Sequence, residues 1–258
     1  MSPTSTRPSP TCLSRAPAIR SRCKSWSTAE GRRKARENSM RIGILGSGLM
    51  GGKLGTLFAR AGHEVVFSYA RSGEKLENLA REAEGKARAG TPREAARDAD
   101  ALLLAVHWSR LDEVLSLAGD LAGKAIMSCS LPMNADNTDL IIAHTSSGAE
   151  ALAKKAPGAR IVSAFNTVPS EVLFGVFAAR HKASRPSLVY CGDEAGSKAL
   201  AAGLIRDIGF DPVDAGPLRI ARYAEPFALL VAQLAYEGNA NDGNGGPELA
   251  YRFERFGP

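Results

Sequence analysis

The feature that most constrains the fold is the glycine-rich segment Gly46–Gly51, which follows an apolar run and opens an amphipathic one. Residues 41–46 read as a buried strand, and residues 49–61 carry helical periodicity that stops at Gly62. A strand that turns into a helix through Gly-x-Gly-x-x-Gly is typical of a dinucleotide-binding unit, because its glycines permit a tight turn, approach of a pyrophosphate and close helix packing. The alternative is a glycine-rich turn without a ligand. We predict a dinucleotide site at Gly46, Ser47, Gly48, Leu49, Met50 and Gly51.

Strand-like and helix-like segments alternate along the rest of the chain. The further predicted strands are 64–68, 86–89, 101–106, 124–129, 160–165, 187–191 and 210–213. The further predicted helices are 74–84, 110–121, 149–155, 170–179, 194–208 and 218–236, with another that begins at Thr91. This alternation is typical of the α/β class and predicts a Rossmann-like, doubly wound parallel sheet with a small C-terminal α/β extension. We expect residues 40–258 to form a single dinucleotide-binding domain that includes this strand–helix extension.

The segment after the second predicted strand indicates which dinucleotide binds. NAD-binding domains usually carry an acidic residue there, which binds the ribose 2′-hydroxyl. Here residues 68–72 include Arg71 and no acid, and the first acid is Glu74. A guanidinium forms strong paired bonds to a 2′-phosphate, which a carboxylate would repel. We therefore predict NADP(H) as the cofactor; the alternative is an exposed surface arginine. The predicted contacts are Ser68, Arg71, Ser72 and Lys75.

The positive charge of the chain is concentrated in its first residues. The formal charge is +6, and residues 1–39 hold nine Lys and Arg residues against two acidic ones. That segment contributes +7, which leaves residues 40–258 at −1, so the predicted domain lacks the basic character of a nucleic-acid-binding protein. We expect residues 1–39 to be a disordered basic leader before a natural start at Met40. No apolar run approaches the roughly 20 residues of a membrane span, so we expect no membrane partner.

Few residues suggest acid–base or metal chemistry. His107 follows the fourth predicted strand, whose carboxyl end borders the nicotinamide in this fold, and it is either a proton donor or a space-filling loop residue. Asp214, Glu225 and Glu237 are acids without a visible partner. The four cysteines form no Cys-x-x-Cys pair and no zinc spacing, so we predict no metal site and leave the catalytic residues unassigned. Unpaired thiols fit a cytoplasmic location.

Several ordered motifs resemble those of a known family. They are the Gly46–Gly51 loop, residues 164–168 (Ala-Phe-Asn-Thr-Val), residues 209–218 (Gly-Phe-Asp-Pro-Val-Asp-Ala-Gly-Pro-Leu), Ala221-Arg222 and Glu225-Pro226. From Met40 to about residue 255 the chain is similar to the NADP oxidoreductases that include the archaeal and actinobacterial NADPH:coenzyme F420 reductases. The reductase domain of the mammalian transmembrane ferric reductases is a more distant relative.

The resemblance implies hydride transfer between NADPH and a deazaflavin, with the two rings stacked in a cleft. Direct transfer depends on placement and exclusion of water more than on an acid or base. Loops after the fourth, fifth and sixth strands would line the cleft. The residues so implied are Val106, His107, Trp108, Ser130, Pro132, Ala164 and Asn166. The chain departs from the family pattern at 131–133, where Leu-Pro-Met replaces Asn-Pro-Leu, and at 70–71, where Ala-Arg replaces Ser-Arg.

The sequence leaves three functions open. The first is an NADP(H)-dependent oxidoreductase whose acceptor is a deazaflavin, coenzyme F420, or a flavin. The second is an NADPH-dependent reductase of a small carbonyl or imine substrate. The third is a dinucleotide-binding sensor or partner subunit without turnover, in which Trp108 or Phe165 fills the space beside the nicotinamide.

The last predicted helix carries a strongly apolar face, formed by Ile220, Tyr223, Phe227, Leu230, Val231 and Leu234. Such a face closes the core of its own subunit or packs against a second copy, and the family resemblance favours the second. We expect the glycine-rich stretch 238–246 to free residues 247–256 to reach outward. We therefore predict a homodimer.

Overall fold

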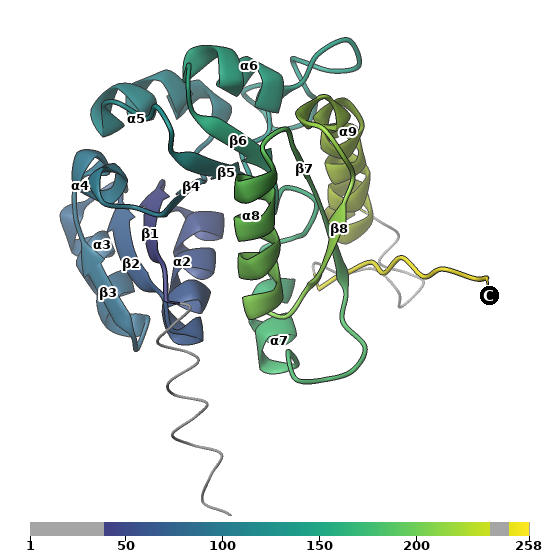
Figure 1. Ribbon diagram of the computed structural model, residues 1–258, viewed down its shortest axis with the longest axis horizontal. Coiled ribbons are helices and arrows are strands. Elements are labelled where there is room, and N and C mark those ends of the chain that lie inside the picture. The colour runs from purple at the N-terminus through teal and green to yellow at the C-terminus, as the bar shows by residue number, and fades with distance from the viewer. Residues whose placement is uncertain (1–38, 238–247, 258) are drawn as a thin grey trace, which may run out of the picture. The chain divides into compact units, whose positions relative to one another are not determined.

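The described part of the chain contains an eight-stranded sheet in the order β3-β2-β1-β4-β5-β6-β7-β8 (Figure 1). The computed structural model describes residues 39–237 and 248–257, so the expected leader lies outside the described residues except for Ser39. The strands are β1 Arg41–Leu45, β2 Glu64–Ser68, β3 Lys86–Ala89, β4 Ala101–Leu104, β5 Ala125–Ser128, β6 Arg160–Ser163, β7 Ser187–Gly192 and β8 Asp211–Asp214. The α-helices are α2 Leu49–Ala61, α3 Gly73–Glu82, α4 Pro92–Arg97, α5 Leu111–Ala118, α6 Gly148–Lys155, α7 Val172–Ala178, α8 Ala195–Asp207 and α9 Ala221–Ala232.

Strands β1 to β6 run parallel, which confirms the predicted α/β class. β1 lies between β2 and β4, so the chain fills one half of the sheet and then returns across β1 to build the other. Helices leave β1 and β4 in opposite directions at this point, which opens a crevice at the carboxyl ends of the two strands. The glycine-rich loop follows β1, so the fold carries it to that crevice.

Strand β7 runs antiparallel to β6, so the predicted parallel sheet holds for β1 to β6 and the strand direction reverses at β7. Two parallel strands need a crossover long enough to return the chain to the other end of the sheet. The helix between β6 and β7 is α7, which has only seven residues, and the chain does not make that return. β8 pairs in parallel with β7 and therefore shares its reversed direction.

Local sequence determines where α2 ends and where α4 begins. Gly62 ends α2 with a left-handed φ of 107°, and its amide donates to the carbonyl oxygen of Ala59 at 3.0 Å. Thr91 caps α4: its Oγ1 accepts from the amide of Glu94 at 3.2 Å, while Glu94 Oε2 accepts from the amide of Thr91 at 2.7 Å. Both ends lie where the sequence predicts them.

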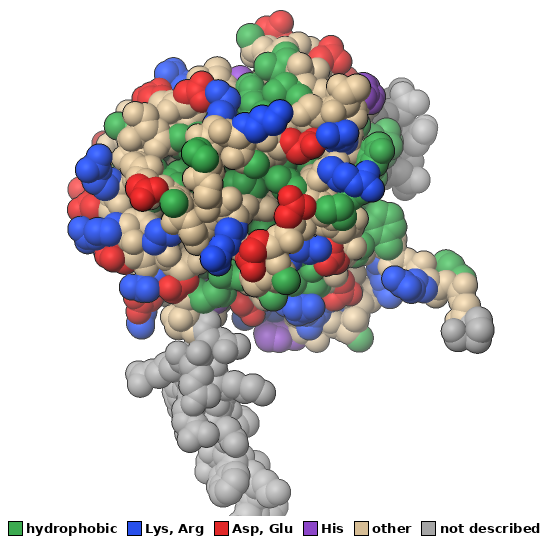
Figure 2. Space-filling model, turned by 45° about the horizontal axis from the view of Figure 1, so that its top comes forward, with side chains coloured by type: hydrophobic (Ala, Val, Ile, Leu, Met, Phe, Trp, Pro, Cys, Tyr) green, Lys and Arg blue, Asp and Glu red, His purple; other side chains and the backbone are tan. Residues whose placement is uncertain are grey.

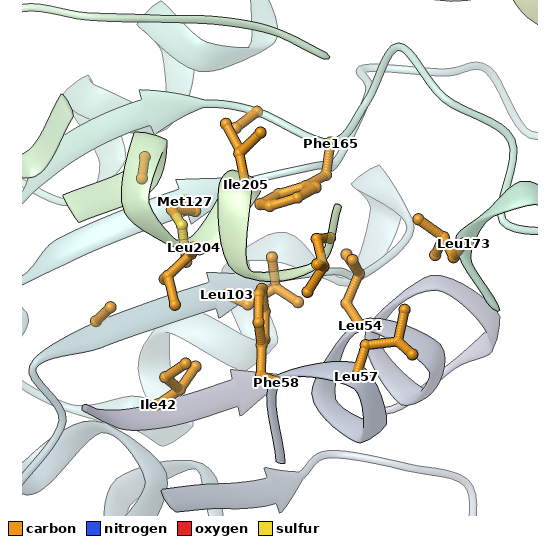
Figure 3. Close-up of a cluster of buried hydrophobic side chains, with 14 of the residues drawn as sticks. Ile42, Leu54, Leu57, Phe58, Leu103, Met127, Phe165, Leu173, Leu204 and Ile205 are labelled. Carbon is orange, nitrogen blue, oxygen red and sulfur yellow. The ribbon is translucent and has the colours of Figure 1, made fainter. Parts of the chain in front are cut away.

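The core consists of apolar side chains on both faces of the sheet. On one face, Phe58 of α2 and Ile205 of α8 pack toward Ile42 and Leu103 of the strands (Figure 3). On the other face, a second cluster draws its side chains from α4, α5 and α6. Phe165, which follows β6, is fully buried and meets Phe58 edge-on, with 6.0 Å between the ring centroids. Phe165 is therefore a core residue.

The last predicted helix is built from three stretches. A 3-10 turn, η2 (Leu218–Ile220), leads into α9, and a π turn, η3 (Gln233–Glu237), follows it. Val231 is buried, whereas Tyr223, Leu230 and Leu234 are exposed. The apolar face predicted from the sequence thus divides: part of it closes the core of its own chain, and part of it faces outward.

Residues near the C-terminus fold back onto their own chain. The hydroxyl of Tyr251 lies 2.7 Å from Thr167 Oγ1 and accepts from the amide of Val189 at 3.2 Å. The amide of Ser187 donates to the carbonyl oxygen of Tyr251 at 2.8 Å. The expectation that residues 247–256 all reach outward was therefore wrong at Tyr251, because hydrogen bonds to β7 and to the loop after β6 hold it. The glycine-rich stretch 238–246 lies outside the described residues, which resume at residue 248.

Charged side chains of both signs are interspersed over the face of the molecule shown in Figure 2, so that face carries no continuous basic surface. This agrees with the nearly neutral charge of residues 40–258. None of the helices in the described residues is both long enough and apolar enough to span a membrane.

Candidate functional site

The glycine-rich loop is pinned to the carboxyl end of β2 by backbone hydrogen bonds. The amide of Gly46 donates to the carbonyl oxygen of Ser68 at 3.1 Å, and that of Ser47 donates to the carbonyl oxygen of Tyr69 at 2.9 Å. The hydroxyl of Ser47 also donates to the carbonyl oxygen of Ser68, at 2.9 Å. Gly46 adopts a φ of 108°, which favours glycine. Two strands that are neighbours in the sheet therefore fix the shape of the loop.

Two glycines of the loop have opposite surroundings. A Cβ at Gly51 would collide with the carbonyl oxygen of Gly46, so this glycine allows α2 to pack against the loop. A Cβ at Gly48 would meet nothing within 4 Å. The protein leaves the space beside Gly48 open, and no acidic residue lies in the first turn of α2. A pyrophosphate fits this position, since the amides and the dipole at the start of a helix favour an anion.

A cavity of about 700 Å³ lies above this loop and brings eight of the seventeen predicted cofactor contacts together. The predicted residues that line it are Gly46, Ser47, Gly48, Leu49, Arg71, Lys75, Val106 and His107. The lining residues that the sequence analysis missed are Tyr69, Ala70, Ala105, Arg110 and Glu113. Tyr69 and Ala70 directly follow β2, which was a usable signal, whereas no motif marks Arg110 or Glu113.

Arg71 and Lys75, which the sequence predicts as contacts of a 2′-phosphate, lie in this cavity with Arg110. Arg71 and Lys75 both line the cavity, and neither forms an ion pair within the described residues. Arg110 Nη1 lies 3.3 Å from Glu113 Oε2, so its charge is already partly balanced. Arg71 and Lys75 are therefore the side chains best placed to bind a phosphate dianion.

Both ring nitrogens of His107 have partners. Nδ1 accepts from the amide of Ser109 at 3.2 Å, and Nε2 lies 3.0 Å from Asn137 Oδ1, an acceptor. These contacts place the proton of the neutral ring on Nε2 and direct it at Asn137. His107 lines the cofactor cavity, but in this arrangement it joins two loops, and its proton does not point at a substrate.

A second, smaller cavity of about 250 Å³ adjoins the first. Leu49, the first residue of α2, lines both cavities. Met50 and Asn166, which were predicted as cofactor contacts, line the smaller one. Its remaining lining residues are Leu131, Thr167, Val168, Pro169, Ser170, Ala228, Val231, Ala232 and Tyr236. None of the described residues that line it carries a charged side chain, so this space suits an uncharged group.

Hydrogen bonds at the edge of the small cavity join three elements. Lys53 Nζ, from α2, donates to the carbonyl oxygen and to Oγ of Ser170, both at 3.1 Å. The hydroxyl of Tyr236, from the π turn, donates to Glu171 Oε2 at 2.7 Å. Burial, and secondly the Glu171 carboxylate, raise the pKa of Tyr236 to about 12, so its hydroxyl keeps its proton at neutral pH.

Several predicted contacts do not line either cavity, and some of them hold neighbouring segments in place. Ser72 caps α3 by accepting from the amide of Lys75 at 3.3 Å. Ser130 Oγ donates to the carbonyl oxygen of Val106 at 2.8 Å and so joins the loops after β4 and β5. The others outside the two cavities are Gly51, Ser68, Trp108, Pro132 and Ala164.

Glu225 is a buried acid whose partner the sequence could not show. Its Oε2 accepts from the amide of Gly148 at 2.8 Å, and its Oε1 accepts from that of Ala149 at 2.9 Å, at the start of α6. Burial raises the pKa of Glu225 to about 7, although the two amides lower it in part. Asp214 instead forms an ion pair with Lys198 at 2.8 Å. Glu225 thus joins α9 to α6 and lines neither cavity.

The described residues contain no group of three His, Cys, Asp or Glu side chains placed to hold a metal ion. Cys191 is buried and Cys129 is partly exposed. A further cavity of about 390 Å³ opens beside β1, β2 and β3, lined by Arg41 and Lys86 among others. These two cations are paired with Asp100 and Glu64, and no predicted site residue lines that cavity.

Comparison with known proteins finds a family model that matches the first part of the domain. The model of the family described as NADP oxidoreductase, coenzyme F420-dependent, matches residues 41–132, which confirms the resemblance drawn from the sequence. Metalloreductase STEAP3 of Rattus norvegicus is 30% identical over 189 residues, which cover 73% of this chain and 36% of that protein. The chain therefore spans about a third of the length of this curated relative.

Solved structures confirm the fold. A candidate F420-dependent NADP-reductase from Arthrobacter sp. FB24 superposes with a TM-score of 0.69 and 23% identity, covering 84% of this chain and 100% of that one. A reductive aminase from Aspergillus terreus, in complex with NADPH and ethyl-5-oxohexanoate, superposes with a TM-score of 0.56 and 19% identity, covering 76% of this chain and 61% of that one.

Proposed function

Because residues 41–132 match the F420-dependent NADP oxidoreductase family, we propose that this protein is an NADP(H)-dependent oxidoreductase. We propose that it transfers a hydride between NADPH and a deazaflavin, coenzyme F420, or a flavin. NADPH, when bound, supplies the hydride. The loop Gly46–Gly51 holds the pyrophosphate, and Arg71 and Lys75 hold the 2′-phosphate.

The observation that carries this proposal is the position of Leu49. This residue lines both the cofactor cavity and the apolar cavity, so the two spaces adjoin at the start of α2. A dinucleotide laid along the glycine loop has its adenosine end toward Arg71 and its nicotinamide end toward the apolar cavity. An uncharged ring in that cavity would lie against the nicotinamide, away from water, which is what direct hydride transfer requires.

A sensor without turnover is less well supported. That alternative needs Trp108 or Phe165 to fill the space beside the nicotinamide. Phe165 is buried in the core against Phe58, and Trp108 begins the 3-10 turn η1 (Trp108–Arg110) and lines neither cavity. The space for an acceptor is therefore open.

The volume of the small cavity favours a second candidate, reduction of a small carbonyl or imine. About 250 Å³ is below the range of roughly 300–1,000 Å³ that is typical of sites for drug-sized ligands. A small substrate fits this volume as it stands, whereas a three-ring deazaflavin would extend beyond the cavity. Carbonyl or imine reduction also needs a proton donor, and Ser170, which carries a hydroxyl, is among the residues that line the cavity.

Anaerobic incubation with NADPH and a panel of acceptors tests the proposal. The panel contains coenzyme F420, riboflavin, flavin mononucleotide and small ketones with and without an amine, and NADPH oxidation is followed at the nicotinamide absorbance. We expect turnover with the deazaflavin or a flavin; turnover with ketones alone would favour the second candidate. Gly48→Val serves as the control for a rate that does not depend on the cofactor site. NADPH binding without turnover of any acceptor would contradict both enzymatic proposals.

We also propose that the protein works as a homodimer in the cytoplasm. The exposed apolar residues Tyr223 and Leu230 on α9 and Leu234 on the π turn η3 support a contact between two copies. The two described cysteines are free thiols, which supports a reducing compartment.

A further inference from the structure

Glu113 is a carboxylate in a cavity whose other charged side chains are cations. Among the described residues that line this cavity, Arg71, Lys75 and Arg110 are basic, and Glu113 alone is acidic. It lies in the first turn of α5, after the fourth strand, and no step of the proposed hydride transfer uses it. An acid at this position calls for an explanation, because an unpaired carboxylate would repel a 2′-phosphate and weaken its binding.

The charge of Glu113 is balanced by its neighbour. Arg110 Nη1 lies 3.3 Å from Glu113 Oε2, three residues earlier on the same turn. The pair has little net charge, so Arg71 and Lys75 still favour an anion. A carboxylate has about four acceptor sites and no donor, so the contact with Arg110 leaves it able to accept from a further N–H group.

Tyr69 forms the wall beside this carboxylate. It adopts a φ of 56°, and its carbonyl oxygen accepts from the amide of Ser47 at 2.9 Å, so the glycine loop fixes its backbone. Burial, and secondly the Glu113 carboxylate, raise the pKa of the Tyr69 hydroxyl. Tyr69 and Glu113 both line the cavity, so an aromatic ring and a carboxylate border the same space as Arg71.

The adenine of NADP(H) matches these two groups. A base stacks on an aromatic ring, and the 6-amino group of adenine is an N–H donor, which a carboxylate can accept. We propose that Glu113 accepts a hydrogen bond from this amino group, with Tyr69 beside the base, and so makes the site selective for adenine over a 6-oxo purine. This inference rests on the proposed function, since it concerns the same cofactor.

The test compares two cofactors that differ at this one position. NADP⁺ and its hypoxanthine analogue, which carries an oxygen in place of the 6-amino group, are titrated by calorimetry. We expect the unchanged protein to bind NADP⁺ about tenfold more tightly, because a 6-oxo group would face the Glu113 carboxylate without a proton between them. In Glu113→Gln we expect the two dissociation constants to agree within about twofold, because an amide can face either group.

Two control variants separate this inference from cofactor binding in general. Asp112→Asn changes the adjacent exposed acid, which pairs with Lys155 and does not line the cavity, and should keep the tenfold ratio. Arg71→Ala should weaken both cofactors equally and also keep the ratio. A ratio near one in the unchanged protein, or an unchanged ratio in Glu113→Gln, would overturn the role of Glu113 while leaving NADP binding intact. If neither cofactor binds, the proposed function itself fails.

Discussion

Arg71 faces the cofactor cavity without an ion pair in the described residues, so its charge is available to a ligand. We expect NADPH to bind at least about tenfold more tightly than NADH, a difference of about 1.4 kcal/mol. In Arg71→Ala this preference should fall, because the variant loses a paired bond to the 2′-phosphate. Fluorescence titration of both cofactors measures the ratio. Arg81→Ala is the matched control, since Arg81 contacts Asn78 on the same helix and does not line the cavity. Equal affinities in the unchanged protein would contradict the assignment.

Glu225 should make stability depend on pH. Burial raises its pKa from an ordinary value of 4.5 to about 7, so the folded protein holds this proton more tightly than the unfolded chain. Its contribution is therefore complete below about pH 4.5 and is lost as the pH rises through 7, a change of about 3 kcal/mol. Urea denaturation from pH 4.5 to 8 measures the free energy of unfolding. In Glu225→Gln, whose amide does not titrate, this decrease in the free energy of unfolding should be absent. Identical pH profiles of that free energy for both proteins would refute the role of Glu225.

Single residues differed in how far the sequence could assign them. Arg71 was predictable because its position follows a strand with a known role in the fold. Glu225 was visible as an acid, but its partners are amides 76 and 77 positions away, which no local pattern shows. Tyr236 was missed, because a π turn brings its side chain to the small cavity.

Two glycines of the loop between β1 and α2 lead to contrasting predictions. A Cβ at Gly48 meets no protein atom within 4 Å, so Gly48→Val should unfold at the same urea concentration as the unchanged protein, yet its side chain would occupy the space of the pyrophosphate. A valine at Gly51 would collide with the carbonyl oxygen of Gly46, so Gly51→Val should lose about 1–3 kcal/mol of stability. Urea denaturation and cofactor titration of both variants provide the check. Full NADPH affinity in Gly48→Val would mean that the dinucleotide does not lie along this loop.

The elements themselves were largely predictable, because their signals are local. Apolar runs mark the buried strands, Gly62 ends α2, and the box at Thr91 and Glu94 begins α4. The direction of β7 was not predictable in this way. It depends on whether the connection from β6 crosses the sheet, and the apolar pattern of a strand is the same in either direction.

The whole molecule presents an apolar surface that a second copy would cover. We expect a mass close to twice the 27.2 kDa of one chain in light scattering at micromolar concentration. Leu230→Glu, on the exposed face of α9, should return the protein to the mass of one chain, because a charge would lose its water in the contact. Leu117→Glu, the same change at an exposed leucine on α5, should not. A mass near 27.2 kDa for the unchanged protein would refute the dimer.

The candidate site as a whole could be predicted only in part. The cofactor cavity draws its predicted residues from the segments after β2, β1 and β4, which are neighbours in the sheet. The small cavity instead joins Leu49 and Met50 to Ala228 and Tyr236, nearly the whole length of the domain away. Its existence depends on how α9 packs, and the periodicity of that helix does not determine this.

The shared position of Leu49 has a stereochemical consequence. The apolar cavity meets the cofactor cavity at one place, so an acceptor there would approach only one face of the nicotinamide ring. The two hydrogens at C4 of NADPH are diastereotopic, and just one of them would point toward that acceptor. Deuterium placed at one C4 position should therefore leave with the transferred hydride, and deuterium at the other should stay in NADP⁺. Mass spectrometry of NADP⁺, starting from each labelled cofactor, would show which face of the ring the acceptor approaches.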